Sequence, residues 1–107
     1  MSGFDNTSFT TRTVAATTDT LTANDYVIIY TNSATKTVTL PAVATTQPGR
    51  VYQLICQNTG VLTIDGNASE TINGATTFAM TAGTVGGVTG RCSIVSDGTQ
   101  WFTLNSQ

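Results

Sequence analysis

Few residues of this 107-residue chain could do acid, base or nucleophilic chemistry. There is no histidine, so Ser-His-Asp and Cys-His arrangements are impossible and the commonest general base is absent. Most of the six acidic residues stand at turn positions, where an aspartate hydrogen-bonds its own backbone; they are Asp5, Asp19, Asp25, Asp65, Glu70 and Asp97. Asp65 and Glu70 could form a carboxylate pair for glycoside hydrolysis, but a turn aspartate and a solvated glutamate explain them better. We therefore predict a protein that is not an enzyme.

No motif in the sequence predicts a cofactor or a metal ion. Gly86-Gly87 lacks the lysine of a phosphate-binding loop, and Asp65-Gly66-Asn67 lacks the remaining ligands of a calcium loop. Cys56 and Cys92, without any histidine, do not make a standard zinc site. Each cysteine lies in an apolar run, so we expect two small buried side chains. A disulfide between neighbouring strands is the alternative, which a reducing cytosol disfavours.

The charge content indicates which partners to expect. Charged residues make up 9% of the chain, against about 25% in a typical globular protein, and the net charge is −2. The basic residues are scattered singly, so we expect neither nucleic acid nor an anionic membrane as partner. Polarity comes from 24 threonines, whose branched side chains suit a pleated surface. Because interface centres are depleted in charge, this composition favours a surface covered by copies of the chain or by another protein.

The elements that must position any site are short strands, and the clearest signal is a closing hairpin. Two β-prone runs flank Asp97-Gly98, a dipeptide that favours a two-residue type I′ turn. The arm after the turn carries the only tryptophan, Trp101, next to Phe102. We predict that this hairpin closes the core.

Residues 26–31 and 50–57 are predicted strands that are apolar on both faces. An antiparallel strand with one wet face should alternate, so we expect both faces to be covered, one of them by another subunit. The residues that we assign to this candidate subunit interface are Tyr26, Ile28, Tyr30, Tyr52 and Leu54.

Further short strands complete an all-β prediction. They are expected at residues 11–16, 36–40, 61–64, 69–73, 76–80 and in the two arms of the hairpin, with a glycine-rich loop or edge segment at 81–90. Turn signals recur every 8–12 residues and no stretch has helical periodicity. The pattern predicts a compact antiparallel β-sandwich or small barrel of 7–9 short strands.

The chain divides into an N-terminal arm with a first strand, residues 1–16, and a single β domain, residues 17–107. Phe4 and Phe9 lie in the arm, and with Arg12 they are candidates for binding a partner. The arm is either a flexible tail or an anchor that orders on a partner. The opening residues have no positive and no apolar region, so we expect no signal peptide.

Several motifs, in this order and spacing, resemble a module that is common in virion proteins of tailed bacteriophages. They are Leu21-Thr-Ala-Asn-Asp-Tyr-Val-Ile-Ile-Tyr30, Lys36-Thr-Val-Thr-Leu-Pro41, Pro48-Gly-Arg-Val-Tyr52, Glu70-Thr-Ile-Asn-Gly74 and Ser96-Asp-Gly-Thr-Gln-Trp101, and together they cover roughly residues 17–104. In that family the module is β-rich, often trimeric, and recurs in tail-fibre, head-fibre and head-decoration proteins.

The resemblance implies a structural protein of the virion, made in the host bacterial cytoplasm. The module is nearly the whole chain, which is more like a capsid decoration (cement) protein that grips the major capsid protein. The alternative is a small tail-fibre or receptor-binding protein that recognises a host glycan. Its candidate sugar-stacking aromatics, Tyr26, Tyr30, Tyr52 and Trp101, all lie within predicted strands, where core packing is the commoner role.

Overall fold

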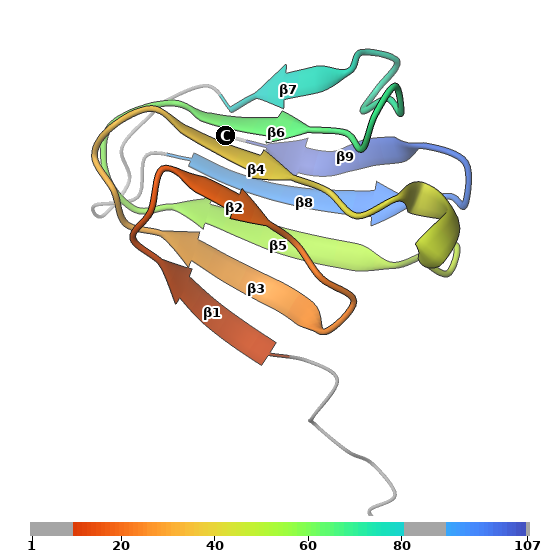
Figure 1. The fold of residues 1–107 in the computed structure, drawn as a ribbon, viewed down its shortest axis with the longest axis horizontal. Helices are drawn as coiled ribbons and strands as arrows, with labels where there is room; N and C mark the ends of the chain where they lie inside the picture. Colours follow the sequence, from red (N-terminus) through yellow and green to blue (C-terminus); the bar gives the residue numbers. More distant parts are fainter. Residues whose placement is uncertain (1–9, 81–89, 107) are drawn as a thin grey trace, which may run out of the picture.

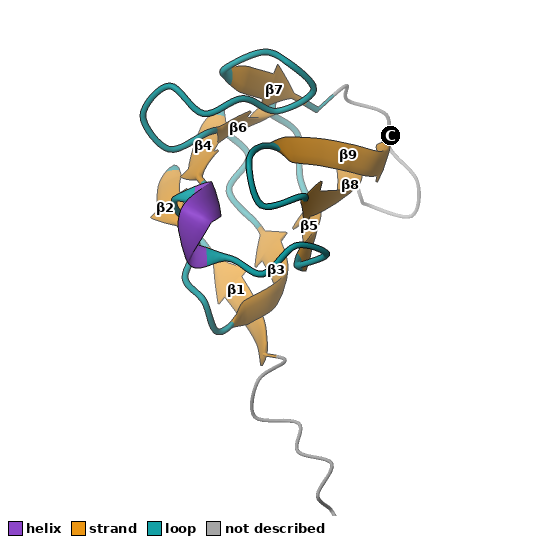
Figure 2. Ribbon diagram, turned by 90° about the vertical axis from the view of Figure 1, so that its right-hand side faces the viewer, coloured by secondary structure: helices purple, strands orange, loops and turns teal. Residues whose placement is uncertain are grey.

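The computed structural model describes residues 10–80 and 90–106, and Figure 1 shows their strands in two packed layers. The described elements, in chain order, are β1 (Thr10–Val14), β2 (Thr18–Thr20), β3 (Asp25–Tyr30), β4 (Lys36–Thr39), the 3-10 helix η2 (Val43–Thr45), β5 (Val51–Cys56), β6 (Leu62–Asp65), β7 (Thr77–Ala79), β8 (Gly90–Ser96) and β9 (Trp101–Ser106). Figure 2, an end view, shows η2 beside the ends of the strands.

The strands form a five-stranded sheet, β1-β3-β5-β8-β9, and a four-stranded sheet, β2-β4-β6-β7. From β1 to β6 the chain alternates between the sheets, so each consecutive pair of strands makes one coil. Pairing within β1-β3-β5 and within β2-β4-β6 is parallel, whereas β7, β8 and β9 pair antiparallel. The predicted all-β sandwich is confirmed. Its sheets are mixed and not antiparallel throughout, because strands that pair lie a full coil apart and run the same way.

The second and third coils stack in one register. Val27 pairs with Gln53 and Lys36 pairs with Leu62, each 26 residues apart, so the turns at 31–35 and 57–61 are equally long. Asn32 and Asn58 occupy equivalent positions in these turns. Asn32 Nδ2 donates to the Ala15 carbonyl at 2.9 Å, and Asn58 Nδ2 donates to the Thr31 carbonyl. Each asparagine thus ties its turn to the coil before it, and this repeat was not predicted from the sequence.

Lys36 is buried between the same two turns, with 1% of its surface exposed. Its ammonium donates to the carbonyls of Asn32 at 2.6 Å and Ala34 at 2.9 Å. The carbonyls of Thr59 and Gly60, from the next coil, lie 3.2 and 3.4 Å from the same nitrogen. Burying an unpaired charge is costly, so four carbonyl dipoles are what makes this position tolerable for lysine.

The closing hairpin completes the core, as predicted. Trp101 is fully buried, and its ring centroid lies 5.8 Å from that of Tyr52. Phe102 points outward instead and is 39% exposed, because it is the next residue along the strand. The predicted two-residue turn is wrong. The loop spans residues 97–100, and the Asp97 carboxylate accepts the N–H groups of Thr99 and Gln100 within it.

Other differences from the prediction are local. β2 and η2 lie between the predicted strands, in segments where no element was predicted. The expected strand at 69–73 is represented only by isolated bridges of Ile72, to Ala75 across an Asn73-Gly74 turn and to Trp101. Residues 1–9 of the arm and 81–89 of the glycine-rich segment lie outside the described residues.

Gly60 and Gly74 provide a test of the stacked turns. Both have positive φ, +93° and +88°, but an added Cβ at Gly60 would lie 2.4 Å from the Ala34 carbonyl, whereas at Gly74 nothing lies within 4 Å. We expect Gly74→Ala to cost about 1 kcal/mol and Gly60→Ala about 2 kcal/mol more, a further loss of roughly 10 °C in Tm. Thermal unfolding of both variants measures this, and equal losses would contradict the close stacking.

Candidate interaction surface

Asp65 and Glu70, the carboxylate pair considered above, serve separate parts of the fold. Glu70 Oε1 accepts the N–H of Val43 at 2.9 Å and so holds the start of η2. Asp65 ends β6, half-buried. Among residues 10–80 and 90–106, no three cysteine or acidic side chains gather as a metal site would require, and no helix is long and apolar enough to span a membrane.

The two cysteines are separate buried thiols, as expected, and form no disulfide. Cys92 on β8 pairs with Leu54 on β5, and Cys56 pairs with Gly90. Burial raises the pKa of the Cys92 thiol to about 11. Because the thiolate is the reactive form, Cys92 is inert at neutral pH.

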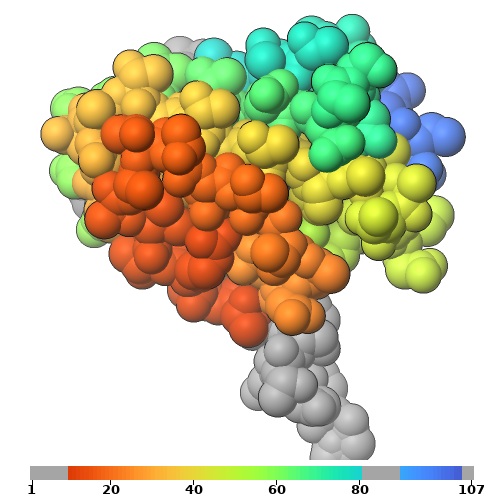
Figure 3. All heavy atoms as spheres, in the orientation of Figure 1, coloured from red at the N-terminus to blue at the C-terminus, as the bar shows by residue number. Residues whose placement is uncertain are grey.

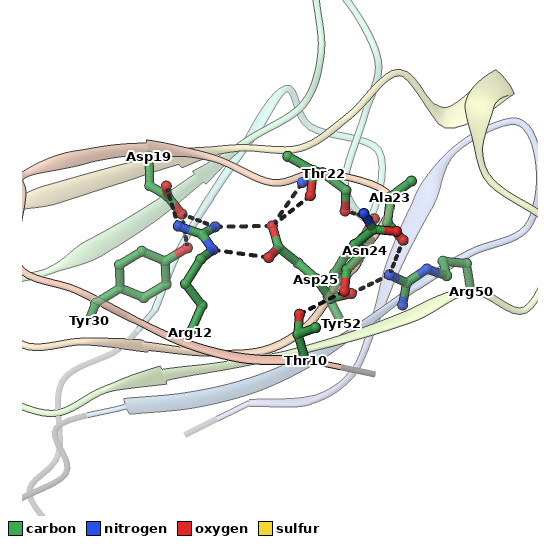
Figure 4. A network of polar contacts seen from close by, with 10 residues as sticks. All are labelled: Thr10, Arg12, Asp19, Thr22, Ala23, Asn24, Asp25, Tyr30, Arg50 and Tyr52. Carbon is green, nitrogen blue, oxygen red and sulfur yellow. Dashed lines mark hydrogen bonds and ion pairs between the residues drawn. The ribbon is translucent and has the colours of Figure 1, made fainter. Parts of the chain in front are cut away.

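Arg12, predicted to bind a partner, is engaged within the chain. It lies on β1, and Figure 4 shows its guanidinium between two carboxylates. Nη1 and Nη2 donate to Asp19 at 2.9 and 2.8 Å, and Nε and Nη2 donate to Asp25 at 2.9 and 3.0 Å. Tyr30 donates its hydroxyl to Asp19 at 2.9 Å. Phe4 and Phe9, the other two candidates, lie outside the described residues.

The environment of this network fixes its protonation states. Burial by itself would raise the pKa of Asp25, but hydrogen bonds from Arg12 and Thr22 outweigh burial and hold the pKa below its ordinary value of 3.8. Burial and the charge of Asp19 raise the pKa of Tyr30, so its hydroxyl stays protonated and donates. An inward-pointing charge on the edge strand β1 also discourages another strand from pairing there.

Arg50 continues the network toward β5 but is held differently. Its guanidinium donates to backbone carbonyls: Nη1 to Val51 at 2.8 Å, and Nη2 to Ala23 at 2.9 Å and to Asp25. Its central carbon lies 4.1 Å from the centroid of the Tyr52 ring (Figure 4). These bonds fasten the turn between β2 and β3 onto β5.

The predicted subunit interface lies mostly inside the chain. Ile28, Tyr30, Tyr52 and Leu54 are each at most 1% exposed, and Tyr26 is half-buried. The first four pack between the two sheets, so they are not available to another subunit. The prediction chose the core face of β3 and β5, because both faces of these strands are apolar.

The opposite face of the same strands is accessible. On β5 the burial alternates, which places Tyr52, Leu54 and Cys56 in the core and the residues between them outside. Pairing aligns the outward residues across the sheet: Ile29 with Ile55 and Val51 with Val95. We define the outer apolar face as Val27, Ile29, Val51, Ile55, Val95, Phe102 and Leu104. Phe102 and Leu104 are 39% and 60% exposed, and the other five are half-buried.

The four-stranded sheet has a different outer face, and Figure 3 views the molecule from this side. Its two cross-strand rows are Thr18, Thr37, Thr63, Ala79 and Thr20, Thr39, Asp65, Thr77. Six of these eight positions are threonine, whose hydroxyl keeps a β surface wetted. The five-stranded sheet mixes apolar and polar side chains on its outer face, where Thr11 pairs with Val27, Gln53 with Ser93 and Ile55 with Arg91. The chain therefore concentrates its outward apolar side chains on this sheet and places mostly threonine on the other.

One signal in the sequence could have identified the outer face. By the alternation of a strand, Gln53 lies on the same face as Val51 and Ile55. The residues of the other face, Tyr52, Leu54 and Cys56, are all apolar. A polar residue in one set marks that set as outward. Residues 26–30 offer no such residue, so the faces of β3 follow only from its pairing with β5.

No protein-family model matches the chain, and no curated protein matches it either.

The Arg12 network predicts a specific pH dependence. Since the folded pKa of Asp25 is lowered, its contribution to stability is complete above about pH 4 and is lost as pH falls through the folded value. Arg12→Gln should cost about 2 kcal/mol at neutral pH and flatten the acid loss of stability. Urea unfolding between about pH 2 and pH 7 measures both effects.

The matched control is Arg91→Gln, at an exposed position of β8. It should leave the pH profile unchanged. Asp97, whose pKa is lowered by the N–H groups of Gln100 and Thr99, leaves a common residual slope in every variant. Identical profiles for the two arginine variants would contradict the assigned role of Arg12.

Proposed function

We propose that this chain is a non-enzymatic structural protein of a bacteriophage virion, a homotrimer that decorates the capsid by binding the major capsid protein. Self-assembly through the outer apolar face is the part of the proposal that the geometry supports best. The virion setting is supported by the motifs in residues 17–104.

The observation that carries the proposal is the contrast between the two outer faces. A chain with 24 threonines could cover both sheets with them, yet the five-stranded sheet presents seven large apolar residues. Valine, isoleucine, phenylalanine and leucine on an accessible sheet gain roughly 25 cal/mol for each Å² of apolar surface that a partner removes from water. Interface centres have this composition, apolar and poor in charge.

The opposite face suits a surface that stays in water. Threonine hydroxyls hydrate the four-stranded sheet without adding charge, and the low charge of the chain limits repulsion between copies. Subunits that contact one another through the five-stranded sheet and expose the four-stranded sheet to water therefore fit both the composition and the fold. A protein that binds only the assembled shell would stabilise that shell by mass action.

Ile55→Glu tests the assembly. Ile55 lies on β5 within the outer apolar face, paired with Ile29 on one side and with Arg91 on the other, so a carboxylate there should be desolvated on association and convert trimers to monomers. The matched control is Thr63→Glu, a half-buried outward position on β6 in the same coil. The wild type and Thr63→Glu should have the native mass of a trimer, and Ile55→Glu that of a folded monomer. A monomeric wild type, or a trimeric Ile55→Glu, would remove the support for assembly through this face.

Capsid binding is measured separately. Purified wild-type protein is added to capsids of the phage that encodes it, prepared without this chain, and both binding and the temperature of shell disruption are recorded. We expect saturable binding and a higher disruption temperature. Trimers that leave such capsids bare but bind host cells would instead favour the tail-fibre alternative.

A further inference from the structure

A pocket lies at the η2 end of the sandwich, between the turn that follows β2 and the loop at 41–50. Figure 3 shows these segments side by side, the first in orange and the second in yellow and yellow-green. The pocket has a volume of about 180 Å³. Ala23, Pro41 and Tyr52 are apolar parts of its wall, and Thr45, Gln47 and Arg50 line it with polar groups.

Arg50 brings a positive charge to this pocket that no carboxylate balances within the described residues. Its Nη1 and Nη2 donate to the backbone carbonyls of Val51, Ala23 and Asp25. The other arginine of the network, Arg12, contacts two carboxylates. Carbonyls hold a guanidinium in place but leave its charge available to an anion.

The guanidinium is also oriented before any ligand arrives. It lies over the Tyr52 ring, and its bonds to three separate backbone positions fix its plane. Among the described residues, no carboxylate pairs with Nε–H or with the Nη1 and Nη2 groups. An arginine held in this way loses little freedom on binding, which is a main cost of recognition.

The remaining lining groups complete the polar pattern. Gln47 is exposed, and its amide makes no hydrogen bond with the described residues. Thr45 donates its hydroxyl to the Ala42 carbonyl at 2.6 Å, so its oxygen presents lone pairs to a ligand. The pocket thus offers donors at Arg50 and Gln47, an acceptor at Thr45 and apolar walls.

Charge and size select the ligand class. One arginine without a carboxylate partner matches a monoanion. Both N–H groups of Nη2 are already bonded to carbonyls, so a carboxylate can accept from a single N–H of Nε or Nη1 but not from a fork of two. The volume is below the roughly 300–1,000 Å³ of sites for drug-sized ligands, so the pocket admits one compact group. We propose that this pocket binds a small monocarboxylate, with Arg50 as the residue that recognises the anion. This site does not depend on the proposed assembly or on the virion setting.

A titration of the full chain followed by NMR tests the site. The three arginine Nε–H signals, from Arg12, Arg50 and Arg91, are recorded while acetate or D-glucuronate is added at constant ionic strength. D-glucose and inorganic phosphate are the neutral and dianionic controls. We expect a saturable shift of the Arg50 signal with both carboxylates, none with glucose, and weaker binding of phosphate.

Two variants locate the binding. Arg50→Lys keeps the charge but loses the oriented guanidinium N–H donors, and should bind carboxylates about 10-fold more weakly. Ala23→Leu narrows the pocket without removing a side chain that bonds Arg50, and should abolish the saturable shift even if Arg50→Lys fails to fold. Arg91→Lys is the matched control and should bind like the wild type.

Four outcomes would overturn the proposal. They are the absence of a saturable shift with either carboxylate, equal responses to glucose and glucuronate, tighter binding of phosphate than of acetate, and parallel shifts of all three arginine signals. The last would indicate a general ionic effect and no pocket. Measuring acetate beside glucuronate also separates a site for the carboxylate alone from one that needs the sugar ring.

Discussion

The structure depends on the register in which its coils stack. β3 and β4 each pair with a strand that lies 26 residues further along the chain. Each residue of this coil therefore has a fixed neighbour in the next coil. That register brings four carbonyls from two turns around one ammonium, and it makes Gly60 approach the backbone of the preceding turn. A turn lengthened by one residue would disturb both contacts and would shift the outward rows of both sheets. Turn length therefore determines the two faces as much as strand composition does.

Strand positions were predictable from the sequence because they depend on local alternation and on turn residues. Whether two strands pair parallel or antiparallel was not predictable, because it depends on which sheet each strand joins. The sequence of residues 26–31 does not indicate the sheet to which this strand belongs. The repeat was hidden because only a few positions are identical between the coils, among them Tyr26 with Tyr52 and Asn32 with Asn58. Side chains that pack between sheets vary freely as long as their volume fits, so a repeat of backbone geometry leaves little trace in the sequence.

The candidate sites were less predictable than the strands. The outer apolar face was confused with the core face, because the sequence of β3 offers two apolar sets and only pairing with β5 distinguishes them. Arg12 was assigned to a partner because its own carboxylates, Asp19 and Asp25, stand in segments that resemble turns. Arg50 showed no function in the sequence, since its surroundings come from loops far apart in the chain. Each of these three cases concerns contacts between different strands or loops.

The burial of Lys36 has a consequence for the chemistry of the surface. Lys36 is the only lysine of the chain, so the folded protein presents no lysine amine to solvent. Acylating reagents and amine-directed cross-linkers will therefore not modify the lysine side chain of the native state, even where subunits lie close together. Reaction at Lys36 requires the two turns to separate, and its rate then follows the opening of the stacked coils. An acyl group on Lys36 therefore shows that the two turns have separated.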